Sequence, residues 1–203
     1  MGKSAETKER ICAIAESAIL QKGFAATSID EIIAEAEITK SGFFYHFKDK
    51  MDLARSLALR YIEQDTLFFE ELFAQAGELS DDPLQRFLIF IKLFGKAMDE
   101  MHSTHPGCLV ASYCYQDYLF NDEIRRLNRE GMLAWRRMFR AHLDEIAAVY
   151  PMKVEIDLDD LADTVSVMVE GGIVLAKVLD QNTILSRQAN IYHNFIRMVF
   201  IAN

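Results

Sequence analysis

A short run of residues at 40–50, KSGFFYHFKDK, carries the side chains best suited to contact a polyanion. In a helix each residue advances by about 100°, so Ser41, Gly42, Tyr45 and His46 fall on one face. Hydroxyl and imidazole groups on such a face can hydrogen-bond to base edges and phosphate oxygens, and a glycine lets the backbone approach closely. Lys40 and Lys50, at the two ends of the segment, carry positive charges that attract phosphate. This face therefore has the chemistry of a DNA-contacting helix.

The opposite face of the same segment is apolar. Phe43, Phe44 and Phe47 fall within one arc, which predicts that all three phenylalanines anchor the helix to a core. Periodicity alone does not separate this arrangement from an ordinary helical hairpin with solvated lysines. The elements around the segment must decide between the two.

Capping signals predict a helix-turn-helix around this segment. Ser28 and Glu31 have the spacing of a capping box, in which each side chain satisfies a free backbone N–H at a helix start. Thr39 stands where it would cap a third helix, from Lys40 to about Phe47. The two helices are then joined by three residues only, Glu37 to Thr39, which is the spacing of DNA-binding helix pairs.

The rest of the chain predicts an all-α fold of about nine helices. Only nine Gly and three Pro occur in 203 residues, and apolar residues recur at spacings of three and four. A first helix is expected from about Ser4 to Lys22, ended by Gly23, and a long fourth helix from about Asp49 to Ala76, ended by Gly77. We expect a DNA-binding domain over residues 1–48 and a second domain over residues 49–203.

Charge and cysteine content limit the setting in which the protein works. The net charge is -9, yet residues 1–50 hold seven Lys and Arg against eight Asp and Glu, so most of the acidic excess lies after residue 50. Three cysteines in no zinc or disulfide spacing indicate a reducing compartment, and we expect the cytoplasm. No uncharged run approaches the length of a membrane span, so no membrane partner is expected.

The segment from Lys22 to Ala54, KGFAATSIDEIIAEAEITKSGFFYHFKDKMDLA, resembles the DNA-binding signature of the TetR family of transcription regulators. The resemblance covers roughly residues 10–57 and implies a near-palindromic, double-stranded operator as partner. It implies phosphate contacts by Thr27, Ser28, Tyr45, His46 and Lys50, and base contacts by Lys40, Ser41, Gly42 and Tyr45. Two positions depart from the family pattern, Glu37 where glycine is usual and Phe44 where tyrosine is usual.

The same resemblance implies that the later helices form a small-molecule site and a homodimer interface. The interface would use the last two helices, where Gly171 and Gly172 permit close contact. An apolar or aromatic effector is expected because candidate lining residues are aromatic or sulfur-containing, although core packing is the ordinary explanation for any single one of them. These residues are Phe90, Phe94, Met98, Tyr113, Trp135, Phe139 and Met168. Tyr115, Gln116, Asp117 and His142 could orient a ligand, but their directions are open.

Other functions have weaker support. Cys108 follows a Pro-Gly pair at a predicted helix start, where the pKa of a thiol can fall, so a redox- or electrophile-sensing regulator is the alternative, with Cys114 as its resolving partner. His102, His105 and Cys108 could suggest a metal site, but Pro106 interrupts the helix between them, and we expect no metal and no cofactor. No nucleophile elbow or phosphate loop appears, so an enzyme is not expected.

Overall fold

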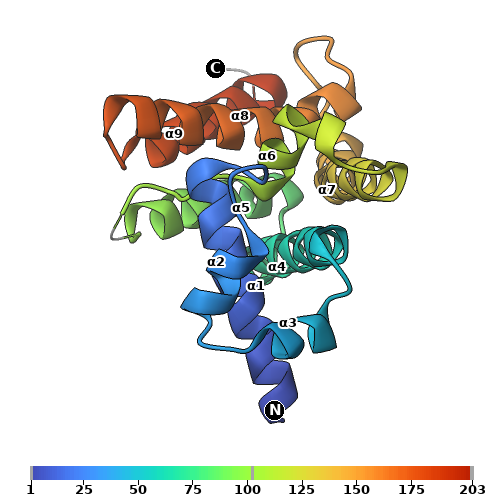
Figure 1. Cartoon of the computed structure of the whole chain (residues 1–203). Helices are drawn as coiled ribbons and strands as arrows, with labels where there is room; N and C mark the ends of the chain where they lie inside the picture. The colour runs from blue at the N-terminus through green and yellow to red at the C-terminus, as the bar shows by residue number, and fades with distance from the viewer. Residues whose placement is uncertain (1, 102, 202–203) are drawn as a thin grey trace. The chain divides into compact units, whose positions relative to one another are not determined.

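The computed structural model describes residues 2–101 and 103–201, without the side chain of Lys3. Within those ranges all regular secondary structure is helical, which confirms the all-α prediction, with nine α-helices, one short 3₁₀ helix and no strand (Figure 1). The elements are α1 (Lys3–Lys22), α2 (Ile29–Glu35), α3 (Lys40–His46), α4 (Lys50–Leu79), α5 (Pro83–Asp99), α6 (Leu109–Tyr115), η1 (Asp117–Leu119), α7 (Asp122–Val149), α8 (Leu158–Leu179) and α9 (Ile184–Phe200).

Side-chain caps fix most of the helix starts. Ser28 Oγ accepts a hydrogen bond from Glu31 N, and Thr39 Oγ1 accepts one from Gly42 N, each at 3.1 Å. Asp82 caps α5, whose first residue is the proline favoured at that position. The predicted end of α4 at Gly77 is wrong: the helix continues to Leu79, and Ser80 N still donates to Ala76 O.

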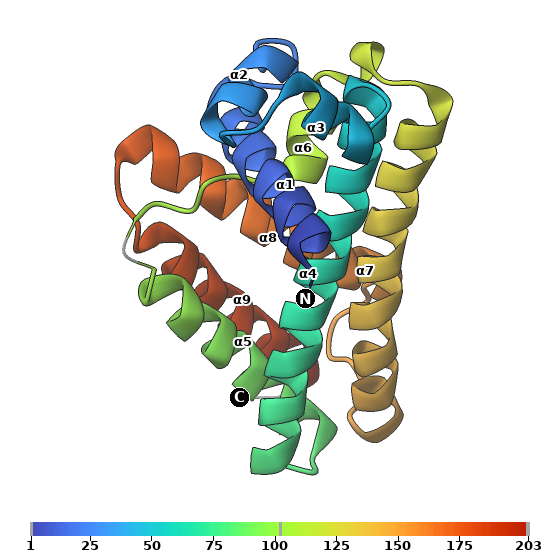
Figure 2. The same cartoon turned by 60° about the horizontal axis from the view of Figure 1, so that its bottom comes forward.

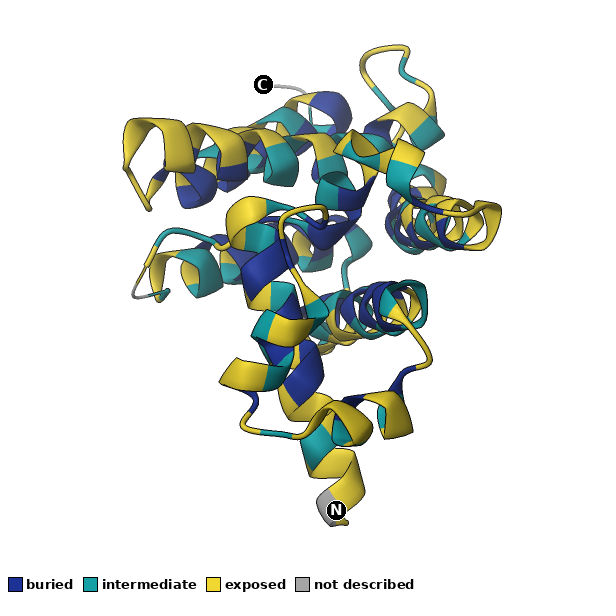
Figure 3. Cartoon of the chain, viewed as in Figure 1, coloured by how far each residue is buried: buried dark blue, intermediate teal, exposed yellow. Residues whose placement is uncertain are grey.

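The chain forms two compact units. The first unit consists of Met1–Gln64 with Pro106–Gly131, and the second of Asp65–His105 with Met132–Asn203. The helix-turn-helix lies in the first unit, together with α6, η1 and the beginning of α7. Figure 3 shows buried and exposed residues alternating along most helices, as amphipathic helices require.

The first unit is built around α1. This helix packs against α2 and α6, and α2 packs against α3. The buried side chains of the unit come from each of its α-helices and their ends; they include Ile11, Ile19, Ile32, Phe43, Phe47, Leu53, Leu57, Tyr113 and Ile124. The helix-turn-helix is therefore seated on a core to which residues far later in the chain contribute.

In the second unit α9 packs against both α5 and α8 (Figure 2). Glycine permits close approach at the contact between α8 and α9. A Cβ added to Gly172 would lie 2.6 Å from Leu185 Cδ1, whereas one added to Gly95 would make an ordinary contact, 3.5 Å from Ala189 Cβ. Gly172 thus serves contact within the chain, whereas a Cβ at Gly171 would meet open space. No described helix has both the length and the apolar character needed to cross a bilayer.

Candidate nucleic-acid interface

The exposed face of α3 carries the polar side chains that the sequence assigned to it. Tyr45 is 76% exposed, and Ser41 and Lys40 are exposed, whereas Gly42 and His46 are half-buried. The Tyr45 and His46 rings meet edge to face with centroids 5.0 Å apart. A hydroxyl, a phenol, an imidazole and an ammonium group therefore surround a glycine on one short helix, which suits the hydrogen-bonding edges of a major groove.

The core face of α3 is narrower than predicted. Phe43 and Phe47 are fully buried, with ring centroids 5.6 Å apart, but Phe44 is 44% exposed. The prediction that Phe44 anchors the helix is therefore wrong. The core covers Phe43 and Phe47 but not Phe44, whose ring meets that of Phe43 edge to face.

The turn between α2 and α3 contains Glu37, at the position where the family resemblance leads us to expect glycine, and this residue is left-handed. Glu37 has a φ of 52°, a value that glycine adopts freely and other residues adopt at a cost. Glu37 N donates to Ala34 O and Ile38 N donates to Ile33 O, both at 3.2 Å. This pair of bonds is the Schellman ending of a helix. The turn keeps its geometry without glycine.

Two residues expected at phosphate are engaged within the protein. Thr27 is 1% exposed, and its hydroxyl donates to Gly23 O at 3.0 Å. Lys50 Nζ donates to Phe24 O at 2.5 Å and lies 4.2 Å from the centroid of the Phe24 ring. Burial holds the pKa of Lys50 below its ordinary value. In this conformation Thr27 and Lys50 hold the loop between α1 and α2, and Ser28 remains exposed as the α2 cap.

The predicted effector residues divide between the two units. Phe90, Phe94 and Phe139 belong to an aromatic cluster of the second unit, in which the rings of Phe73 and Phe90 stack with centroids 3.8 Å apart. Trp135 is buried one helical turn before Phe139, and Met98 and Met168 are half-buried. Tyr113 lies in the first unit, where its hydroxyl donates to Ala54 O at 3.1 Å.

Two of the polar residues that could orient a ligand, His142 and Gln116, have partners within the protein. His142 stacks on Phe73 with ring centroids 3.7 Å apart, and burial lowers its pKa. Gln116 faces the loop between α1 and α2, where its Oε1 accepts a hydrogen bond from Phe24 N at 2.9 Å. Sequence reasoning could not find that contact, because the two residues are 92 positions apart and no local pattern joins them.

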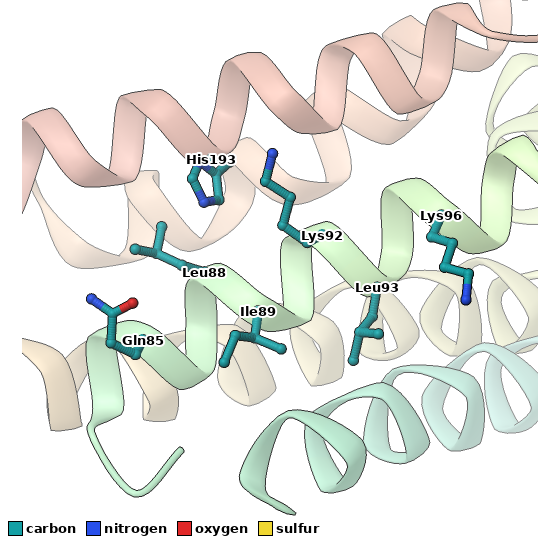
Figure 4. A pocket seen from close by; sticks show the side chains of 7 residues that line it. All are labelled: Gln85, Leu88, Ile89, Lys92, Leu93, Lys96 and His193. Carbon is teal, nitrogen blue, oxygen red and sulfur yellow. The ribbon is translucent and has the colours of Figure 1, made fainter. Parts of the chain in front are cut away.

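An open groove of about 250 Å³ lies on α5 beside His193 of α9 (Figure 4). Leucine and isoleucine side chains form its apolar part, and Lys92 and Lys96 stand beside them. Lys92 Nζ donates to Asn190 Oδ1 at 2.7 Å. None of the predicted effector residues lines this groove, whose full lining is Gln85, Leu88, Ile89, Lys92, Leu93, Lys96 and His193.

The cysteines form no disulfide in the described chain. Cys108 is the half-buried residue before α6, Cys114 is exposed, and Cys12 is buried, which raises the pKa of its thiol to about 11. His102 lies outside the described residues. Among those described, no three His, Cys, Asp or Glu side chains are grouped so that they could hold a metal ion.

Known proteins resemble the chain over both units. A family model described as "Bacterial regulatory proteins, tetR family" matches residues 11–57. The transcriptional regulator AcuR of Cereibacter sphaeroides is 28% identical over 163 residues, covering 79% of this chain and 71% of AcuR. The regulator YxaF of Bacillus subtilis is 23% identical over 176 residues, covering 87% of each chain. A crystal structure of a TetR regulator from Chloroflexus aurantiacus has a TM-score of 0.79 at 25% identity and covers 100% of both chains.

The proteins that match the chain are DNA-binding transcription regulators, and its helix-turn-helix fits that class of protein. The chain belongs to the TetR family. Regulators of this family bind operator DNA and dimerise. The comparisons do not favour the alternative of a thiol-based sensor at Cys108.

Proposed function

We propose that the protein is a homodimeric repressor that an apolar or aromatic small molecule releases from a near-palindromic operator. In this proposal residues 1–48 are the DNA-binding domain and residues 49–203 are the effector-binding and dimerisation domain. The exposed face of α3 supports the DNA-binding part, and a buried donor without a partner supports the effector part.

The exposed side chains of α3 support a set of proposed DNA contacts. Ser41, Gly42 and Tyr45 would meet base edges, with His46 and Lys40 at base edges or phosphate and Ser28 at phosphate. Lys40 Nζ lies 3.8 Å from Asp30 Oδ1, but both side chains are more than 70% exposed, so water and salt screen the pair and Lys40 can turn to a phosphate.

The dimer interface that we propose is an apolar stripe on α8, with exposed side chains of α9. Val167, Gly171, Val174 and Val178 follow one another at spacings of four, three and four, so they share one helix face. Val167 and Val178 are 69% and 75% exposed, and the α9 residues Ile191 and Met198 are also exposed. A contiguous apolar surface of this kind favours burial against a second copy.

Trp135 carries the effector part of the proposal. The side chain is 5% exposed, and within the described part of the chain its Nε1 has no hydrogen-bond partner. Buried donors are normally satisfied, because an unpaired one costs roughly 1–3 kcal/mol. The neighbouring turns of α7 carry Phe139 and His142, whose rings contact Phe69 and Phe73 respectively. An aromatic effector with a hydrogen-bond acceptor would match both the unpaired Nε1 donor and the neighbouring aromatic rings.

Trp135 also supplies the assay, because it is the single tryptophan of the chain. The wild-type protein first selects duplexes from a random pool, and aromatic carboxylates, quinones and phenols are then screened for release of the selected duplex. We expect a releasing compound to change Trp135 fluorescence and a Phe139→Ala variant to respond to it more weakly. Release with unchanged Trp135 fluorescence would contradict the placement of the effector, and failure to select any sequence would contradict operator recognition itself.

A further inference from the structure

The loop between α1 and α2 leads directly into the helix-turn-helix. It begins at Gly23, which ends α1 with a φ of 86°, and it finishes at Ser28, which caps α2. Inside the loop Thr27 donates to Gly23 O, and Thr27 N donates to Phe24 O at 3.3 Å. The backbone conformation at residues 23–25 therefore determines where α2 starts.

Gln116 holds this loop from the end of α6. Its Oε1 accepts hydrogen bonds from Phe24 N at 2.9 Å and from Ala25 N at 3.4 Å. Its amide also lies against Gly23, because a Cβ added there would be 2.8 Å from Gln116 Nε2. One side chain thus contacts three consecutive loop residues, and the space that it occupies exists because residue 23 is glycine.

The carbonyl group and the ring of Phe24 also have partners within the first unit. Its carbonyl oxygen accepts from Lys50 Nζ, at the first residue of α4. Its ring is 3% exposed and lies 4.6 Å from the Phe120 ring and 6.0 Å from the Tyr113 ring, measured between centroids. The N–H, the carbonyl and the ring of one loop residue are therefore held by the α6–η1 segment and by the start of α4.

We propose that Gln116 is a positioning residue for DNA recognition, which orients α2 and α3 by holding the backbone of Phe24 and Ala25. Gln116 has no place in the helix-turn-helix signature, and the inference does not depend on the proposed effector. Without the acceptor, the Phe24 N–H loses its partner and the loop can leave the conformation that α2 requires. Contacts with base edges depend on this geometry more than the general attraction to phosphate does.

Gln116→Met and Gln116→Glu form a matched pair for the test, because both keep the length of the side chain and only Glu keeps an acceptor. Each variant is titrated with a duplex that the wild-type protein selects from a random pool and with an unrelated duplex of equal length. We expect Gln116→Met to lower the ratio of the two affinities roughly tenfold. Gln116→Glu should keep this ratio within about twofold of wild type, and this rescue identifies the acceptor as the cause.

Amide hydrogen exchange provides an independent readout, with faster exchange at Phe24 and Ala25 expected in Gln116→Met only. An unchanged affinity ratio in Gln116→Met would overturn the proposal, whether both affinities stay the same or both fall equally. A Gln116→Glu variant as impaired as Gln116→Met would overturn it too. If the wild-type protein selects no duplex, operator recognition fails instead.

Gly23→Ala tests the other side of the same contact. The added methyl group would displace the Gln116 amide, and the positive φ strains any side chain at this position. We expect Gly23→Ala to lower the affinity ratio as Gln116→Met does, and the double variant Gly23→Ala/Gln116→Met to be no worse than Gly23→Ala alone. Fully additive losses would show that the two residues act separately and would overturn the contact as the cause.

Discussion

Replacement of Glu37 by glycine should stabilise the helix-turn-helix. Glu37 is the left-handed residue of the turn, with a φ of 52° between the last carbonyls of α2 and the cap of α3. A side chain in this conformation brings its Cβ close to the following carbonyl oxygen, at a cost of roughly 1–2 kcal/mol. Glycine removes that contact, and the hydrogen bonds from residues 37 and 38 to α2 can remain.

The net gain is smaller than the strain that is removed. Glycine increases the backbone entropy of the unfolded chain, which costs roughly 0.5–1 kcal/mol. We therefore expect Glu37→Gly to raise the free energy of unfolding by about 0.5–1 kcal/mol. This change corresponds to a roughly two- to fivefold increase in amide protection over residues 29–47.

Hydrogen exchange resolved to peptides is the suitable assay, because it reports on the helix-turn-helix separately from the second unit. The control is Glu37→Gln, which removes the charge but keeps a side chain at positive φ. Protection that rises equally in both variants would attribute the gain to charge, and unchanged protection in Glu37→Gly would refute the strain. Both variants lose one negative charge near DNA, so both should bind any duplex slightly more tightly at low salt.

Three further predictions concern the recognition helix, the core and the interface. Gly42→Ala places a methyl group 3.3 Å from Thr39 Oγ1, on the face of α3 that we propose contacts DNA. Affinity for a selected duplex, measured by fluorescence anisotropy, should therefore fall at least roughly tenfold. The midpoint of urea unfolding should change little, because alanine favours the helix. Acidification from pH 7.5 to 5.5 should destabilise the wild type in urea unfolding, because the pKa of His142 is lowered in the folded protein and the unfolded chain binds the proton first. His142→Phe should reduce that loss of stability. An unchanged pH dependence in this variant would contradict the burial of His142 as the cause. Val174→Glu should dissociate the dimer in sedimentation experiments, whereas Val154→Glu, an exposed valine outside α8, should not.

Local features of the molecule followed from the sequence because the interactions that make them join near neighbours. The caps of α2 and α3 connect residues three positions apart, and the turn of three residues between these helices needs no distant partner. The family resemblance marked Glu37 as the turn position where glycine is usual, and the structure has it in the left-handed conformation. The exposed face of α3 was likewise readable, because one turn of helix fixes which side chains share a face.

Which apolar side chains are buried, and which partners the polar groups bond to, depends on residues distant in sequence. Only the tertiary structure determined these two features. Phe44 had the hydrophobicity of an anchor, but the core ends beside Phe43. Thr27 and Lys50 had the chemistry of phosphate contacts, yet in the structure both donate hydrogen bonds to carbonyl oxygens of the loop between α1 and α2. Gln116 reaches that loop across 92 residues, because folding places α6 beside α1. The sequence by itself determined the helix-turn-helix and the polar face of α3, because neighbouring residues make both; only tertiary packing determined which side chains hold them in place.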